Sequence, residues 1–247
     1  MKITAVVCAY NEASHLPACI FSLLSQTRPP DEIIVINNAS TDDTGEVARA
    51  IARCASSVRV VDEPAKGLVV ARETARRVAH GSVLAYVDAD CRVPLRWLER
   101  VEAQFIKTPE AVAITGPYKF YDWDVVGRLV IAVYDVLVAP LTHVAVHHVL
   151  RIGAILYGGN FAARADALET IGGFDRTIEF HGEDTNLGRR LAVIGRVKMC
   201  ADCWVWTSAR RYVAMGKSKV FSLYVRNFWS EILRHRPADG EHLDVRS

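Results

Sequence analysis

The sequence predicts an α/β fold with a mostly parallel, Rossmann-like central sheet and helices on both of its faces. Short apolar runs rich in Val and Ile alternate with helical patterns through the first half of the 247 residues. These runs are apolar throughout rather than at every second residue, as expected for strands covered on both sides. Parallel units of this kind have right-handed connections, so polar groups that follow successive strands share one edge of the sheet.

The first half contains eight predicted elements. Pro94 suits the first turn of the last helix, where a missing N–H costs little. We expect the strands at residues 3–8, 32–36, 58–61 and 83–87, and the helices at residues 16–25, 44–53, 69–79 and 94–107.

The second half departs from this alternation. We expect a strand at residues 112–115, Val-rich stretches from residue 123, a helix at 185–194 and an apolar helix at 220–233. Because no flexible linker or internal repeat separates the halves, we predict one domain over residues 1–236 and a polar tail over 237–247.

Composition excludes some classes of function. A net charge of +2 with 23% charged residues gives no electrostatic reason to expect a nucleic-acid partner. Cys200 and Cys203 form a Cys-x-x-Cys pair, but no second pair stands at metal-ligand spacing. We therefore interpret the six cysteines as packing thiols of a reduced, cytoplasmic protein.

The sequence gives no signal for a membrane-spanning segment. The apolar run that begins at Ile3 is too short for the core of a signal peptide. The most apolar stretch, residues 129–141, is interrupted by Asp135. It is shorter than the roughly 20 residues that a spanning helix needs.

The motif Asp88-Ala89-Asp90 directly follows the predicted strand at 83–87. Carboxylates at the carboxyl end of a buried strand suit a hard divalent cation, which takes oxygen ligands and shares them with phosphates. Alone the motif is common and is often a solvated turn. Its weight comes from polar segments that follow the other strands.

Five segments together resemble the family-2 glycosyltransferases, which have the GT-A fold. They are Val7 to Glu12, Asp31 to Thr44, Lys66-Gly67 with Arg72, Asp88 to Asp90, and Gly182 to Asp184. The resemblance implies a nucleotide-sugar half at about 1–115 and an acceptor half at about 116–236. It implies that nucleotide contacts are made by Ala9, Tyr10, Asn11, Glu12, Asn38, Lys66, Arg72, Asp88 and Ala89, and that Mn²⁺ or Mg²⁺ binds Asp90.

One segment departs from the family pattern. Many members carry Asp-Asp-Gly-Ser where this chain has Asn37-Asn38-Ala39-Ser40. An Asn side chain both donates and accepts, so uracil recognition remains compatible with the sequence. The expected donor is a nucleotide-diphosphate sugar, with UDP as the first choice of nucleotide.

The resemblance also implies the type of reaction. The second acid of Glu183-Asp184 corresponds to the general base, which deprotonates an acceptor hydroxyl as it attacks the anomeric carbon with inversion. Glu183 is the alternative base. Two acids at a helix start also have a purely structural explanation, since they favour the helix dipole.

Further residues follow from the same comparison. Gly158, Gly159, Asn160 and His181 are expected near the acceptor or the sugar, and Arg210 and Arg211 near the diphosphate. Some relatives have a metal-binding His just before this basic pair, whereas the chain has Thr207. The metal requirement is therefore left open.

The apolar helix at 220–233 carries basic residues around its apolar face. Ordinary packing against the domain is the first explanation of this pattern, and docking on an acidic membrane surface is the alternative. A contact with the inner face of the membrane and a homodimer through the Val-rich segment both stay open.

Two other functions fit part of the pattern. A nucleotidyltransferase would share the sheet and the acid-bound Mg²⁺, but the loop after the first strand has no glycine. A binding protein that lost turnover would retain the fold without a complete set of acids. Asp88, Asp90, Glu183 and Asp184 are all present.

Overall fold

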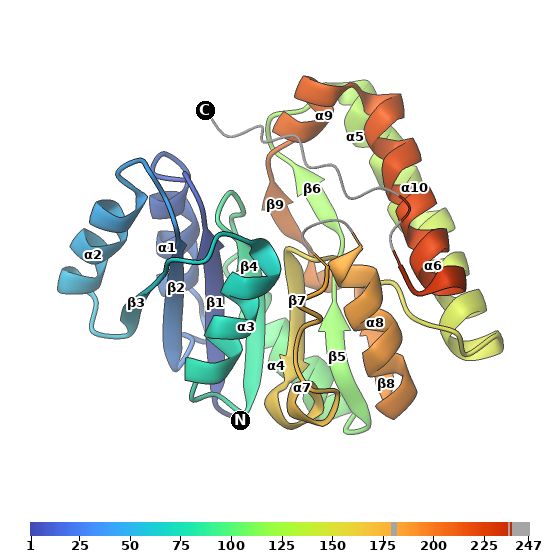
Figure 1. Ribbon diagram of the computed structural model, residues 1–247, viewed down its shortest axis with the longest axis horizontal. Coiled ribbons are helices and arrows are strands. Elements are labelled where there is room, and N and C mark those ends of the chain that lie inside the picture. The colour runs from blue at the N-terminus through green and yellow to red at the C-terminus, as the bar shows by residue number, and fades with distance from the viewer. Residues whose placement is uncertain (179–181, 237, 239–247) are drawn as a thin grey trace.

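The computed structural model describes residues 1–178, 182–236 and 238 and is built around a seven-stranded sheet (Figure 1). The strand order is β3-β2-β1-β4-β7-β5-β8, and only β7 runs antiparallel to its neighbours. This arrangement confirms the predicted mostly parallel sheet. The strands are β1 Ile3–Ala9, β2 Glu32–Asn38, β3 Val58–Glu63, β4 Val83–Asp88, β5 Ala111–Thr115, β7 Asn160–Arg164 and β8 Arg196–Met199.

Helices cover both faces of the sheet and bury separate apolar clusters against it. Alternate residues of β1 explain the division, since Ala5 and Val7 pack on one face and Val6 packs on the other. On the first face lie α1 Leu16–Leu24, α2 Thr44–Cys54 and α4 Trp97–Lys107. On the second lie α3 Leu68–Val78, α7 Ala165–Thr170 and α8 Glu183–Ile194.

The eight elements predicted for the first half are all present, with their ends shifted by three residues or fewer. The largest shift is at α4, which begins at Trp97 rather than at residue 94. Residues 94–97 instead form a turn that is closed by the Trp97 N–H donating to the Pro94 carbonyl at 2.8 Å. Proline therefore precedes this helix and is not part of its first turn.

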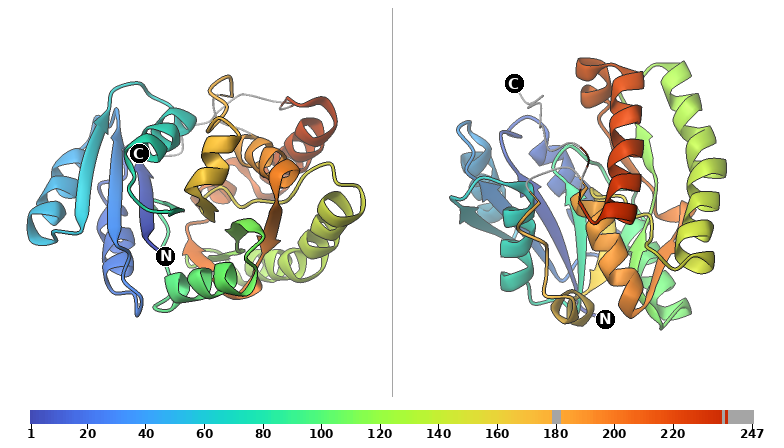
Figure 2. Two further views of the ribbon diagram at one scale, coloured as in Figure 1. Left: turned by 90° about the horizontal axis from the view of Figure 1, so that it is seen from below. Right: turned by 45° about the vertical axis from the view of Figure 1, so that its right-hand side comes forward.

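A second layer stands beside the carboxyl end of the sheet. Its two-stranded sheet pairs β6 Tyr118–Phe120 with β9 Val205–Thr207, which follows the short η3 Ala201–Cys203. Its helices are α5 Val125–Val133, η1 Tyr134–Val138, α6 Ala139–His143, η2 Val144–Val149, α9 Arg210–Met215 and α10 Lys217–Arg234. Figures 1 and 2 show α5 to α6 and α10 as two long rods along one side of the molecule.

The prediction that the apolar stretch at residues 129–141 is too short for a membrane-spanning helix was wrong. α5, η1, α6 and η2 form one continuous helix, Val125–Val149, which is long and apolar enough to cross a membrane by length and composition. Asp135 does not interrupt the outer surface of this helix, because its side chain is turned inward and accepts a hydrogen bond from the Tyr157 hydroxyl at 2.5 Å. The apolar outer surface therefore continues past it.

Ala39 adopts the left-handed conformation at the end of β2, with φ of +55°. This conformation costs a residue with a Cβ about 1 kcal/mol more than glycine. It is also the position at which the family pattern has Gly. The turn that follows β2 therefore stores strain that a glycine would remove.

We expect Ala39→Gly to raise the free energy of unfolding by about 1 kcal/mol, as measured by urea denaturation. The control is Ala50→Gly, at an exposed position inside α2, where glycine should lower stability by about 1 kcal/mol. Equal losses in the two variants would contradict the assignment of strain to the turn.

Candidate active site

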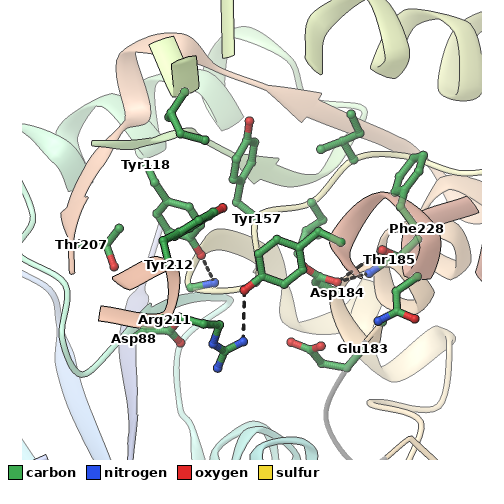
Figure 3. A pocket seen from close by; sticks show the side chains of 18 of the residues that line it. Asp88, Tyr118, Tyr157, Glu183, Asp184, Thr185, Thr207, Arg211, Tyr212 and Phe228 are labelled. Atoms are coloured by element: carbon green, nitrogen blue, oxygen red, sulfur yellow. Dashed lines mark hydrogen bonds between the residues drawn. The ribbon is translucent and has the colours of Figure 1, made fainter. Parts of the chain in front are cut away.

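A cavity of about 590 Å³ lies where the carboxyl end of β4 meets the start of α8, under α9 and α10. Figure 3 shows Asp88 and Asp184 reaching it from these two elements. The cavity brings together eleven of the predicted site residues: Glu12, Arg72, Asp88, Ala89, Asp90, Gly158, Gly159, Glu183, Asp184, Arg210 and Arg211.

Arg72 connects the two acidic motifs. Its side chain is only 3% exposed, and its guanidinium donates to Glu183 at 2.7 Å and to the Gly158 carbonyl at 2.7 Å. Asp88 lies 3.4 Å from the same guanidinium. Burial opposes the charge of Arg72, but the carboxylates of Glu183 and Asp88 outweigh it and raise the arginine pKa. The residue is therefore a permanent cation that fixes both acids.

Gly158 and Gly159 are needed for the close approach of these acids. A Cβ on Gly159 would lie 2.1 Å from Asp88 Oδ2, and one on Gly158 would lie 3.1 Å from Glu183 Oε1. The first distance is impossible for a real side chain, so any larger residue would displace Asp88. The Gly159 N–H also donates to the Tyr118 hydroxyl at 2.5 Å.

Asp184 is the second residue of α8 and lines the cavity. The Thr185 N–H donates to its Oδ1 at 2.7 Å. Burial, followed by repulsion from Glu183, raises the pKa of Asp184 to about 7. A carboxylate with this pKa is a better proton acceptor near neutral pH than an ordinary aspartate.

Arg210 connects the acid that follows β1 to an acid that follows β4. Its guanidinium lies 3.0 Å from Asp90 Oδ2 and forms a bidentate ion pair with Glu12, which is buried. The hydrogen bonds to Glu12 and the charge of Asp90 outweigh burial and raise the pKa of Arg210. Arg211 points toward the second layer, where it donates to the Tyr224 hydroxyl at 3.1 Å.

The donor set at β4 suits a hard divalent cation. Asp88 and Asp90 offer carboxylate oxygens one residue apart, and both line the cavity. Thr207, which stands where some relatives have a metal-binding histidine, also lines the cavity. A hydroxyl oxygen is compatible with Mn²⁺ or Mg²⁺, so the residues present fit such an ion.

Asn160 does not line this cavity. Its side chain is 1% exposed, and it accepts from Trp97 Nε1 at 3.1 Å while donating to the carbonyls of Gly116 and Cys203. These bonds connect β7 to the loops that flank it. We therefore leave Asn160 out of the proposed acceptor contacts and assign it a positioning role.

Asn38 is engaged in a similar way. Its amide donates to the Ala65 carbonyl at 2.7 Å, and its carbonyl oxygen accepts from the Gly67 N–H at 2.8 Å. The side chain thus shapes the loop between β3 and α3 and is buried. The carboxamide that was expected to read the base holds this loop in the structure.

The remaining nucleotide-contact candidates lie beside the cavity. Lys66 donates to the Tyr10 hydroxyl at 2.8 Å and sits over the same ring. Asn11, with φ of +51°, accepts from the Thr41 N–H at 2.8 Å. Ala9 is buried at the end of β1. His181 lies outside the described residues.

Sequence reasoning missed the aromatic wall of the cavity. Tyr118, Tyr134, Tyr157, Tyr212 and Tyr224 all line it, together with Asp135. Burial raises the pKa of Asp135 to about 6, although Tyr157 hydrogen-bonds to it. The one available signal was a lone acid within an otherwise apolar run, because an acid held in apolar surroundings is a candidate for a functional site.

The family-2 glycosyltransferase model, described as "Glycosyl transferase family 2", matches residues 4–172 of the chain. The chain belongs to this family. The match covers more than half of the sequence and includes β1 to β4 with all the polar segments that follow them.

Curated relatives align over part of the chain. Glycosyltransferase AglE of Haloferax volcanii is 32% identical over 101 residues, which are 40% of this chain and 33% of that protein. Glycosyltransferase GlyG of Streptococcus pneumoniae is 32% identical over 121 residues, 49% of this chain and 40% of that protein. The alignments thus cover less than half of either relative.

Solved structures match most of the fold. A mannosyltransferase from Pyrobaculum calidifontis, in complex with GDP-Man and Mn²⁺, has a TM-score of 0.71 at 22% identity, covering 97% of this chain and 65% of that one. TarS of S. aureus, residues 1–349 in complex with UDP-GlcNAc, has a TM-score of 0.66 at 18% identity and covers 84% and 58%. The fold is therefore GT-A.

We expect Arg72→Met to lower the free energy of unfolding by about 3 kcal/mol, because it leaves the largely buried carboxylate of Glu183 without its cation. Urea denaturation measures the loss. The control is Arg49→Met, which removes an exposed ion pair with Asp62 and should cost less than about 1 kcal/mol. If the two variants lose the same amount, the central role of Arg72 is wrong.

Proposed function

We propose that the chain transfers a sugar from a nucleotide-diphosphate donor to an acceptor hydroxyl, with inversion at the anomeric carbon. The observation that carries this proposal is the single cavity lined by Asp88 and Asp90 on one side and by Asp184, with a pKa of about 7, on the other. One pair of acids suits a cation and a diphosphate, and the other acid suits proton removal.

The donor belongs at the end of β4. A Mn²⁺ or Mg²⁺ ion held by Asp90 would offset the negative charge that builds on the departing nucleotide diphosphate. Arg210 already contacts Asp90 and carries a permanent charge that suits phosphate oxygens. The nucleotides of the two solved neighbours, GDP-Man and UDP-GlcNAc, make both bases reasonable candidates. We propose a UDP-sugar, following the family resemblance.

Asp184 rather than Glu183 is the proposed base. Glu183 is held by Arg72 at 2.7 Å, so its carboxylate is already engaged in an ion pair within the domain. Asp184 has no comparable cationic hydrogen-bond donor among its described bonds, which come from Thr185. Its raised pKa provides driving force for taking a proton from a hydroxyl.

The acceptor belongs on the side of the aromatic wall. Gly158 and Gly159 leave room beside Asp184, and Tyr118 and Tyr157 flank them in the cavity. Aromatic faces and phenol hydroxyls are suited to a ligand with both apolar and polar groups. An acceptor hydroxyl placed here would point at the proposed base.

Calorimetric titration tests the donor site. We expect either UDP or GDP to bind in the presence of Mn²⁺, and Asp90→Ala to weaken that binding by more than about tenfold, since even outer-shell partners of a metal change affinity by that much. The control is Asp202→Ala, an exposed acid outside the cavity. Binding of neither nucleotide by the wild type would refute the donor site.

The pH dependence of turnover tests the base. Because the pKa of Asp184 is raised to about 7, the carboxylate is protonated at lower pH, so turnover should fall about tenfold per pH unit below that value. The measurement is the release of nucleoside diphosphate from a bound donor, with water as the acceptor.

Asp184→Asn should reduce this release by at least about a hundredfold while nucleotide binding stays unchanged, because an amide accepts no proton. Asp175→Asn, at a half-buried aspartate outside the cavity that is hydrogen-bonded to Thr177, is the control. Nucleotide binding without release in the wild type would indicate a donor-binding protein instead of a transferase.

A further inference from the structure

The continuous helix Val125–Val149 presents an apolar surface that the described part of the chain does not cover. Only 17% of its most apolar window is buried. Leu129, Leu137 and Leu141 are 64%, 55% and 71% exposed, and none of them lines the cavity. Exposed apolar areas of this extent are characteristic of surfaces that bind a partner or a membrane.

Charges on this helix and on α10 are separated by sign. The acids are turned inward: Asp135 bonds to Tyr157, and Glu231 is fully buried against Asn186 and Arg189. The cations are all exposed on the two helices, namely Arg128, Lys217, Lys219, Arg226 and Arg234. Of these, Lys217 pairs with Asp124 just before α5. The outer surface is therefore apolar with a positive rim.

The second half of the helix Val125–Val149 also packs against the domain. Ala139, His143 and Val146 of this helix are buried on its inner side. Both ring nitrogens of His143 have backbone partners, the Val197 carbonyl at 3.0 Å and the Ile155 N–H at 3.2 Å. These contacts hold the second half of the helix against the domain, so that its exposed side faces outward along the surface of the protein.

The apolar surface is continuous with the cavity. Tyr134 of η1 and Phe221 of α10 touch edge to face with ring centroids 6.0 Å apart, and both line the cavity. Phe221, Val225 and Trp229 are exposed as well as lining it. In Figure 2 the two helices stand beside one another on the same side of the molecule.

We propose that the face formed by Val125–Val149 and α10 docks on an anionic lipid bilayer, with its apolar side chains in the interface and its cations at the headgroups. A helix that is apolar on one side and basic at its edges binds such surfaces. Docking would bring the cavity to an acceptor hydroxyl carried by a lipid. This second part rests on the proposed function.

A second copy of the chain is a poorer occupant of this face. A two-fold contact between identical faces would bring the two positive rims together. Neither helix offers an exposed acid to neutralise them, since Asp135 and Glu231 are both engaged within the domain. An anionic bilayer supplies the missing negative charge.

Vesicle flotation with the full chain tests the proposal. We expect binding to phosphatidylcholine vesicles that contain 30% phosphatidylglycerol and at least tenfold weaker binding to pure phosphatidylcholine, because each surface cation contributes roughly a fivefold factor. Lys219→Glu with Arg234→Glu should abolish the difference. A carbonate wash should release the protein, whereas its retention would show a spanning helix and overturn surface docking.

The triple variant Leu129→Glu, Leu137→Glu and Leu141→Glu should lose vesicle binding. The matched control is Ile106→Glu with Val193→Glu, which places charges at apolar positions that are 69% and 80% exposed on α4 and α8. Nucleotide binding, measured on every variant, reports an intact fold.

Light scattering on the same samples measures the molar mass and so tests whether a second copy of the chain binds this face. A dimer that the triple variant disrupts, together with no binding to either vesicle, would overturn the proposal in favour of self-association. If the wild type binds nucleotide but neither kind of vesicle, the docking proposal is wrong and the proposed donor site stands. Vesicle binding without nucleotide binding would leave docking supported and refute the proposed function.

Discussion

The buried guanidinium of Arg72 is the interaction on which the site depends. It joins the acid at the end of β4 to the acid at the start of α8 and to the backbone at Gly158. A buried cation of this kind is tolerated only when carboxylates and carbonyls surround it. The same pairing makes Glu183 and Asp184 different, because Glu183 is engaged with Arg72 while burial raises the pKa of Asp184.

Close backbone approach makes this arrangement possible. β7 is inserted antiparallel between β4 and β5, which brings Gly158 and Gly159 against the acids. Arg210 returns from the second layer to contact Asp90 and Glu12. The cavity is thus closed by residues from both ends of the chain, and both layers contribute to its lining.

The second layer has two surfaces with different roles. Its inner surface supplies four of the cavity's five tyrosines, Tyr118, Tyr134, Tyr212 and Tyr224, and its outer surface is apolar with a positive rim. Both arise from the same helices, because a helix in which nearly all positions are apolar can face the protein on one side and an apolar environment on the other. The interior acids Asp135 and Glu231 explain how charge is kept off the apolar outer surface.

The sequence by itself determined the order of strands and helices in the first half and the polar groups at the strand ends, because hydrophobic periodicity and strand ends are local properties. Only the tertiary structure decided which acids are paired. Arg72 and Glu183 are 111 residues apart, and no local pattern shows that they meet. Tertiary contacts likewise engaged Asn38 and Asn160 with backbone groups. They also turned Asp135 inward, which leaves the outer surface of the helix Val125–Val149 apolar on both sides of this acid.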